Sequence, residues 1–245
     1  MVKLECGYLN AMGLPNPSYE SFLPELEKAK DKAGVPVIAS IFGGNPEEFR
    51  MVAEGLISGK PDAFELNVSC PHAMGYGASV GTDPAMVKAV TSAICEVTDI
   101  PVWVKLTPNV TDIVTIGKAA QAGGADALVA INTVRGMAID IHSGYPVLGN
   151  RFGGLSGEAV RPVAVKCVYD LYANLDIPII GVGGISTWQH AVEMIMAGAS
   201  AVQIGSGVFE GLNVFSDITA GINWFLKEHG YTKIEDITGI AHERF

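Results

Sequence analysis

The sequence is poor in basic residues and has no long hydrophobic run. Its 245 residues include 16 Lys and Arg against 26 Asp and Glu, which gives a formal net charge of −10. Proteins grip nucleic acids and anionic membranes through clusters of Lys and Arg, so this balance disfavours both as partners. No stretch approaches the roughly 18 consecutive apolar residues that suggest a membrane span. We therefore expect a soluble protein whose partners are small molecules or other proteins.

Cysteine is also scarce, and its spacing argues against a metal site. The four cysteines lie far apart, at Cys6, Cys70, Cys95 and Cys167. They lack the paired spacing that metal sites use, and no secretory segment precedes them. Because this pattern is typical of a reducing compartment, we predict a cytoplasmic protein without a metal.

The apolar residues, 49% of the sequence, are arranged as alternating strands and helices. From residue 34 onward, short β-branched runs alternate with longer amphipathic stretches, a pattern typical of repeated βα units around a parallel sheet. The predicted strands are Val35–Ile41, Ala63–Val68, Val102–Leu106, Ala127–Ile131, Pro178–Val182 and Ala201–Ile204. The predicted helices are Tyr19–Lys32, Pro46–Ile57, Pro84–Val97, Asp112–Ala122, Glu158–Asn174, Thr187–Ala197 and Val214–His229. We expect one domain over residues 1–245.

These elements predict an α/β fold of the (β/α)8 TIM-barrel class that lacks about its first two strands. A closed barrel needs eight strands and the sequence supplies about six, while Met1–Pro17 is predicted to be a loop. An open six-stranded sheet is the competing architecture. The helix at Tyr19–Lys32 precedes a strand, as the end of an earlier βα unit would, so we favour the incomplete barrel.

Polar residues follow the predicted strands, where a (β/α)8 enzyme carries its reactive groups. The second strand runs into Asn67 and Cys70, and the glycine-rich residues 73–82 can close over a ligand. A cysteine in this position is more often a small buried residue than a reactive one, but its polar neighbours favour reactivity. Lys105 lies inside an apolar run, where a buried charge needs an anionic partner unless the side chain reaches solvent. The fourth strand ends in Asn132-Thr133.

Two glycine-rich turns and one long connection complete the candidate features. Gly181–Ser186 and Gly205–Gly207 follow the last two strands, where such turns often bind phosphate through backbone N–H groups. The alternative is that they are tight βα turns without a ligand. The connection of residues 133–156 is longer than an ordinary βα loop. Within it, Ala138–His142 and Tyr145–Leu148 predict a β-hairpin that covers the substrate, meets a partner subunit or is merely tolerated.

Five segments of the chain resemble dihydroorotate dehydrogenases, and they follow one another in the family's order. They are Asn67–Pro71, Val104–Ile113, Ile131–Thr133, Gly153–Gly157 and Gly183–Ile185. The segment Gly136–Asp140, and cysteine in place of serine at position 70, resemble the soluble class that pairs with an iron–sulfur flavoprotein and passes electrons to NAD.

The resemblance implies oxidation of (S)-dihydroorotate to orotate in de novo pyrimidine biosynthesis, with FMN as cofactor. Cys70 matches the family's base, which removes a proton from the substrate while a hydride leaves for the flavin. The implied cofactor residues are Asn67, Lys105, Ile131, Gly157, Gly183, Gly184, Gly205 and Ser206. The implied substrate residues are Asn10, Ala11, Met12, Gly13, Leu14, Asn67, Asn132 and Thr133. The implied partner is an electron-transfer subunit with FAD and a [2Fe–2S] cluster, within a heterotetramer built on a homodimer of catalytic subunits.

Two departures from the family pattern keep alternatives open. His72 stands where these enzymes usually have Asn, and Cys70–Gly75 is closer to dihydropyrimidine dehydrogenase, a pyrimidine reductase. Asn10–Asn16 instead resembles the orotate-binding loop, and we weight it more heavily. The family's first two strands have no counterpart in this sequence, so a non-catalytic truncated fragment is a third hypothesis.

Overall fold

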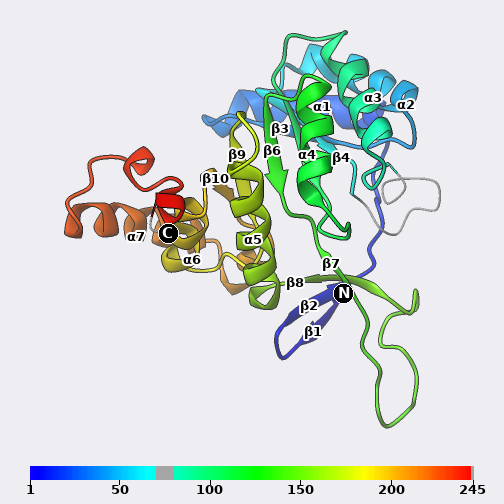
Figure 1. Ribbon diagram of the computed structural model, residues 1–245. Helices are drawn as coiled ribbons and strands as arrows, with labels where there is room; N and C mark the ends of the chain where they lie inside the picture. Colours follow the sequence, from blue (N-terminus) through cyan, green and yellow to red (C-terminus); the bar gives the residue numbers. More distant parts are fainter. Residues whose placement is uncertain (70–79, 244–245) are drawn as a thin grey trace. The chain divides into compact units, whose positions relative to one another are not determined.

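A computed structural model describes residues 1–69 and 80–243 and divides the chain into two compact units. Unit 1 comprises Met1–Ala11 and Val129–Phe245, and unit 2 comprises Met12–Leu128. Parallel strands alternate with helices in each unit (Figure 1). This alternation confirms the predicted α/β class with βα repeats, whereas the single-domain expectation stays a prediction.

Unit 2 is built on three parallel strands in the order β3–β4–β5. They are β3 (Ile38–Ile41), β4 (Ala63–Asn67) and β5 (Val102–Leu106). Their register pairs Ser40 with Glu65 and Asn67 with Lys105. The backbone N–H of Asp126 donates to the carbonyl of Val102 at 2.8 Å, immediately before β6 (Ala127–Ala130) begins. All of these strands lie within one or two residues of their predicted positions, except that β3 starts three residues late, after Pro36.

Helices α2, α3 and α4 of unit 2 each begin where a side chain caps an N–H group of the first turn. The helices of this unit are α1 (Tyr19–Ala33), α2 (Pro46–Leu56), the 3-10 turn η1 (Ile57–Gly59), α3 (Pro84–Cys95) and α4 (Ile113–Ala122). Asn45, Asp83 and Asp112 each accept an N–H from the first turn of the helix that follows, at 2.9 Å. Helices α2, α3 and α4 pack side by side against the strands, and Phe49 and Phe64 are fully buried there. The core of unit 2 therefore lies on the helix-covered side of its sheet.

Unit 1 carries two parallel strands, β9 (Ile179–Val182) and β10 (Ala199–Gln203). The N–H of Ile131, directly after β6, donates to the carbonyl of Val182 at 2.8 Å. Helix α5 (Arg161–Tyr172) packs on β9, α6 (Trp188–Met196) packs on β10, and α7 (Val214–Glu228) packs on α6. The predicted helix Glu158–Asn174 instead starts as a 3-10 turn, η2 (Glu158–Val160). Three more 3-10 turns complete unit 1: η3 (Ser206–Glu210), η4 (Ile234–Asp236) and η5 (Ile240–Glu243).

An antiparallel sheet in unit 1 corrects the prediction that Met1–Pro17 is a loop. Its strand order is β1 (Val2–Leu4), β2 (Gly7–Asn10), β8 (Gly153–Ser156), β7 (Val134–Gly136). Figure 1 shows the β1–β2 hairpin in blue beside β8. The loop prediction was wrong for residues 2–10 because strands of three and four residues are too short to show an alternating pattern. Their partner β8 is also distant in the sequence and rich in glycine, which strands usually avoid.

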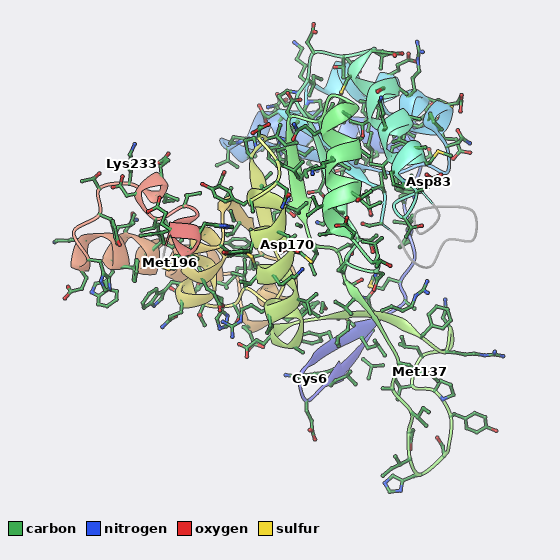
Figure 2. All side chains as sticks on the ribbon, viewed as in Figure 1. Cys6, Asp83, Met137, Asp170, Met196 and Lys233 are labelled. Carbon is green, nitrogen blue, oxygen red and sulfur yellow. The ribbon has the colours of Figure 1, made fainter. Side chains whose placement is uncertain are left out.

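The excursion between β7 and β8 contains the predicted hairpin in a reduced form. Ile139 and Pro146 form one isolated antiparallel bridge, and the Asp140 N–H donates to the Tyr145 carbonyl at 2.9 Å. Gly144, at φ 73°, supplies the left-handed residue of the turn. Met137, at the start of the excursion, is half exposed (Figure 2).

Candidate active site

The predicted base, Cys70, lies outside the residues that the structure describes, and so do Pro71 and His72. The strand that leads to it is described: β4 ends at Asn67, whose Oδ1 accepts the Ser69 hydroxyl at 3.0 Å and the Ser69 N–H at 3.3 Å. Beyond the undescribed segment, Gly81 lies against the Val68 carbonyl so closely that any side chain would collide with it. Ser69 and Gly81 therefore both lie at the carboxyl end of β4, the edge where the base was predicted.

The other three cysteines are described, and two of them have thiols that resist ionisation. Burial raises the pKa of Cys167 to about 11, and burial also raises the pKa of Cys95, with Asp126 contributing. Cys6 is exposed at the turn between β1 and β2 (Figure 2). A general base needs an accessible thiolate near neutral pH, so neither Cys95 nor Cys167 suits that role.

Lys105 has the anionic partner that its apolar surroundings require. Its Nζ lies 3.2 Å from Oε1 of Glu65, and the two side chains are 20% and 8% exposed. The Ser40 hydroxyl is 3.4 Å from the same oxygen. The sequence indicated that a buried Lys105 needs an anionic partner, but it did not identify Glu65 as that partner. The available signal was a carboxylate in the middle of the otherwise apolar strand Ala63–Asn67.

In unit 1, several predicted cofactor residues line one cavity of about 560 Å³. Gly157, Gly184 and Ser206 line it directly, while Gly183 and Gly205 are chain neighbours of lining residues. Ile185, Ser186 and Gly207, from the two predicted glycine-rich turns, also line it. The sequence did not predict the remaining walls, which are Lys3, Leu4, Glu5, Cys6, Gly7, Tyr8, Glu158, Ala159, Arg161 and Glu210. The first six of these belong to the β1–β2 hairpin, which was predicted to be loop, so its sequence offered no reason to place it here.

The glycines of this cavity are required by close backbone approach. Gly184 has φ +69°, and a Cβ added to it would lie 2.7 Å from Cβ of Arg161 and 2.8 Å from the Gly157 carbonyl oxygen. A Cβ on Gly157 would lie 2.7 Å from Cα of Gly7. Real Cβ atoms do not approach other atoms so closely, and glycine lets backbone N–H groups reach a ligand. This cradle, formed by turns after strands and at the start of helices, suits a phosphate group.

The side-chain charges around the cavity are mixed. Arg161 pairs with Glu193 at 2.7 Å, and the Ser186 hydroxyl donates to Glu158 at 3.0 Å. Among the described residues, the Nε of Arg161 is a buried nitrogen without a hydrogen-bond partner, and it remains as a donor for an anion. Because acidic side chains line the cavity as well, an anion would depend on directed N–H donors more than on net charge.

His190 supports the turn that contains Gly184. Its Nδ1 lies 3.4 Å from the Ser186 backbone nitrogen and 3.3 Å from the Ser186 hydroxyl. Burial lowers the pKa of His190, and the nearby Arg161 lowers it further. A neutral imidazole can accept the Ser186 N–H, whereas an imidazolium cannot.

Unit 1 also brings together three of the predicted substrate residues. Asn10, in β2, pairs with Gly154 of β8, and its Nδ2 donates to the Gly154 carbonyl at 3.4 Å. Gly154 packs directly against the Thr133 side chain. Asn132 Oδ1 accepts the Thr133 N–H at 2.7 Å. Ala11 ends the first segment of unit 1, while Met12, Gly13 and Leu14 begin unit 2, where Met12 is 64% exposed.

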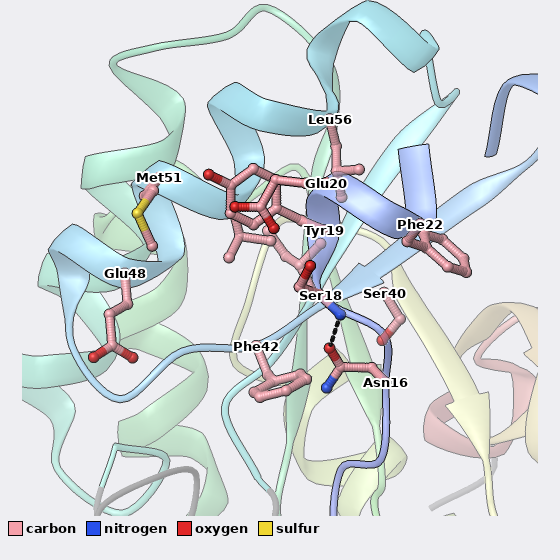
Figure 3. Close-up of a pocket in the computed structure, with 12 residues that line it drawn as sticks. Asn16, Ser18, Tyr19, Glu20, Phe22, Ser40, Phe42, Glu48, Met51 and Leu56 are labelled. Atoms are coloured by element: carbon pink, nitrogen blue, oxygen red, sulfur yellow. Dashed lines mark hydrogen bonds between the residues drawn. The ribbon is translucent and has the colours of Figure 1, made fainter. Parts of the chain in front are cut away.

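Unit 2 has a second cavity, of about 550 Å³, beside its terminal strand β3 (Figure 3). Aromatic side chains of Tyr19, Phe22 and Phe42 line it, with Glu20 and Glu48 among its polar groups. None of the described residues that were predicted for the active site lines it. We therefore assign it no part in the chemistry.

Comparison with known proteins agrees with these features. Residues 1–226 match the family model described as dihydroorotate dehydrogenase. The chain is 68% identical to the "Dihydroorotate dehydrogenase B (NAD(+)), catalytic subunit" of Methanosarcina mazei, over 99% of this chain and 77% of that protein. Proteins of the same name from Pyrococcus abyssi and Methanocaldococcus jannaschii are 54% and 51% identical, over 98% and 99% of this chain and 80% of each relative. With a family model that matches residues 1–226 and relatives of this identity and coverage, the chain belongs to the dihydroorotate dehydrogenase family.

Proposed function

We propose that this chain oxidises (S)-dihydroorotate to orotate in pyrimidine biosynthesis, with FMN as the first electron acceptor. The observation that carries the proposal is the cavity of unit 1, where Gly157, Gly184 and Ser206, assigned to the cofactor from sequence, line the same space. These three residues come from separate segments of the chain, and residues that bind one cofactor are expected to line one cavity.

The residues of unit 1 are suited to hold the phosphate of FMN. Backbone N–H groups of the Gly183–Ser186 and Gly205–Gly207 turns would donate to phosphate oxygens, and the cavity would admit the rest of the cofactor. Ile131, Asn67 and Lys105 are proposed to contact the flavin, with the Lys105 ammonium beside its ring. Bound FMN supplies a two-electron acceptor for the hydride that leaves the substrate.

The proposed substrate residues provide the polar groups that a cyclic imide requires. Dihydroorotate carries ring N–H groups, carbonyls and a carboxylate, and the amides of Asn10, Asn67 and Asn132 can both donate and accept. Thr133 adds a hydroxyl, and residues 11–14 add backbone N–H groups for the carboxylate. Buried polar groups of this kind reject analogues that leave them unpaired. Cys70 is the proposed base for the ring proton, so its thiolate must be stabilised by its neighbours.

We also propose that electrons leave through another subunit. The sequence has no paired cysteines for an iron–sulfur centre and no G-x-G-x-x-G dinucleotide fingerprint. The relatives are named catalytic subunits of an NAD(+) enzyme, which supports the existence of a second subunit. From the resemblance of the sequence to the soluble class, we propose that this subunit carries FAD and a [2Fe–2S] cluster. Two catalytic subunits pairing as a homodimer would complete the heterotetramer.

The test is steady-state production of orotate by the purified chain loaded with FMN, with an artificial dye as terminal acceptor. We expect orotate to form only when both dihydroorotate and FMN are supplied. The Cys70→Ala variant, assayed at the same flavin occupancy, should lose most of this activity. Orotate formation that does not depend on flavin, or no formation by a flavin-loaded chain, would refute the proposal.

A further inference from the structure

A buried carboxylate of unit 2, Glu65, has no part in the chemistry described so far. Its side chain is 8% exposed in the centre of β4, and a carboxylate in such surroundings is costly unless a cation compensates it. Lys105 Nζ, 3.2 Å away, is that cation. Removing one member of a buried ion pair lowers the stability of a protein far more than replacing both members, so Glu65 and Lys105 are expected to act together.

The strand register explains why these two side chains meet. Glu65 is paired with Trp103 on β5, and Asn67 is paired with Lys105 two residues further on. Glu65 and Lys105 therefore occupy the same face of the sheet as diagonal neighbours, a separation that long side chains span. On the other side, β3 brings Ser40 opposite Glu65, with its hydroxyl 3.4 Å from Oε1. The carboxylate thus has neighbours on both flanking strands.

We infer that Glu65 is a positioning residue that holds the Lys105 ammonium at the carboxyl edge of β5 for its contact with the flavin. This inference rests on the proposed function, in which Lys105 lies beside the flavin ring. Lysine has a flexible four-carbon stem with several rotamers. Without the carboxylate, the ammonium loses the ion pair that restricts its rotamers, and FMN must then order it further on binding. With the carboxylate, that ordering is complete before FMN binds.

The first test uses Lys105 itself and needs no cofactor. The amine is labelled with acetic anhydride in the folded chain, and its modification is followed by peptide mass spectrometry. Because the ion pair holds the Lys105 amine against the buried Glu65, Glu65→Gln should let the reagent reach the amine more often and raise the labelling rate several-fold. Glu54→Gln is the matched control, since Glu54 pairs with Arg50 at 2.9 Å in an exposed position on α2. An unchanged rate in the folded Glu65→Gln variant would overturn the inference.

The second test is a double-mutant cycle on FMN affinity, measured by quenching of flavin fluorescence. Glu65→Gln should weaken binding about tenfold and alter the visible spectrum of the bound flavin, while Glu54→Gln should change neither. In a Lys105→Met background, Glu65→Gln should have no further effect on FMN affinity. An equal loss in both backgrounds would show that Glu65 does not act through Lys105, and would overturn the inference.

Two outcomes separate this inference from the proposed function. If Lys105→Met leaves FMN affinity and spectrum unchanged, the placement of Lys105 beside the flavin fails, while the labelling test still decides whether Glu65 holds the amine. If Glu65→Gln does not fold, Glu65→Asp keeps the charge and shortens the side chain by one methylene. That variant should fold, with a Lys105 labelling rate above that of wild type and an FMN affinity between those of wild type and Lys105→Met, and wild-type values would contradict the inference.

Discussion

Substitution of Gly184 by alanine tests the proposed phosphate site of unit 1 most sharply. The residue has φ +69°, and an alanine in the left-handed region costs roughly 1–2 kcal/mol. The added Cβ would also lie 2.7 Å from Cβ of Arg161 and 2.8 Å from the Gly157 carbonyl oxygen. Overpacking of this kind costs about 1–3 kcal/mol. Gly184→Ala should therefore lower the free energy of unfolding by about 2–5 kcal/mol.

Gly230→Ala is the matched control in the same unit. Gly230 has φ +75°, close to that of Gly184, but a Cβ there would meet nothing within 4 Å. It should therefore cost only the conformational part, about 1–2 kcal/mol. The difference between the two variants isolates the close approach of the Gly184 turn to Gly157 and Arg161.

The assay has two readouts, the urea midpoint and the affinity for FMN. Gly184→Ala should lower the urea midpoint more than Gly230→Ala does, with the slope of unfolding against urea unchanged in both variants. Gly184→Ala should also weaken FMN binding by more than about tenfold, whereas Gly230→Ala should not. Equal stability losses would refute the packing argument. Normal FMN affinity in a folded Gly184→Ala variant would refute the role of this turn in binding phosphate.

The thiols and His190 provide three more outcomes. Cys70→Ala should slow reduction of bound flavin by dihydroorotate about 10²–10⁴-fold in rapid mixing, whereas Cys95→Ala should leave the rate within about twofold. Burial raises the pKa of Cys167 from 9.0 to about 11, so its contribution to the free energy of unfolding should be intact below pH 9 and be lost as the pH rises toward 11. The urea midpoint should fall over that interval, and it should fall less in Cys167→Ala. Burial lowers the pKa of His190 below 6.5, so the unfolded chain takes up the proton first as the pH falls. The free energy of unfolding should therefore fall as the pH drops below about 6.5. An equal fall in His190→Gln would contradict the role of His190.

Most of the fold could be predicted because the apolar pattern of a parallel sheet is strong and local. The runs at Ala63–Asn67 and Val102–Leu106 are bounded by polar turns. Helices α2, α3 and α6 start at an Asn, Asp or Thr cap that is followed by a helical pattern of apolar residues. Both features act within a few residues, so the sequence displays them directly. The antiparallel sheet is different, because β2 pairs with β8, which lies far from it in the sequence.

The candidate site shows the same division between local and long-range information. The turn with Gly183 and Gly184 could be singled out because a run of glycines in one turn is visible in the sequence, whereas Gly157 was named only from the family resemblance. All three have positive φ and close backbone neighbours that require glycine. Arg161 and Tyr8 were missed as cavity walls because their positions depend on how the β1–β2 hairpin packs. Glu65 was not predicted as the partner of Lys105 for another reason. A single acidic residue within a strand can be matched with its partner only when the register between β4 and β5 is known.

A single-turnover comparison of two substrates distinguishes dihydroorotate oxidation from the chemistry of a pyrimidine reductase. The FMN-loaded chain is mixed anaerobically with dihydroorotate or with dihydrouracil, which lacks the carboxylate, and bleaching of the flavin is followed in time. Dihydroorotate should reduce the flavin at least about 100-fold faster, because dihydrouracil leaves the donors proposed for the carboxylate unpaired. Equal rates, or faster reduction by dihydrouracil, would contradict the proposed function.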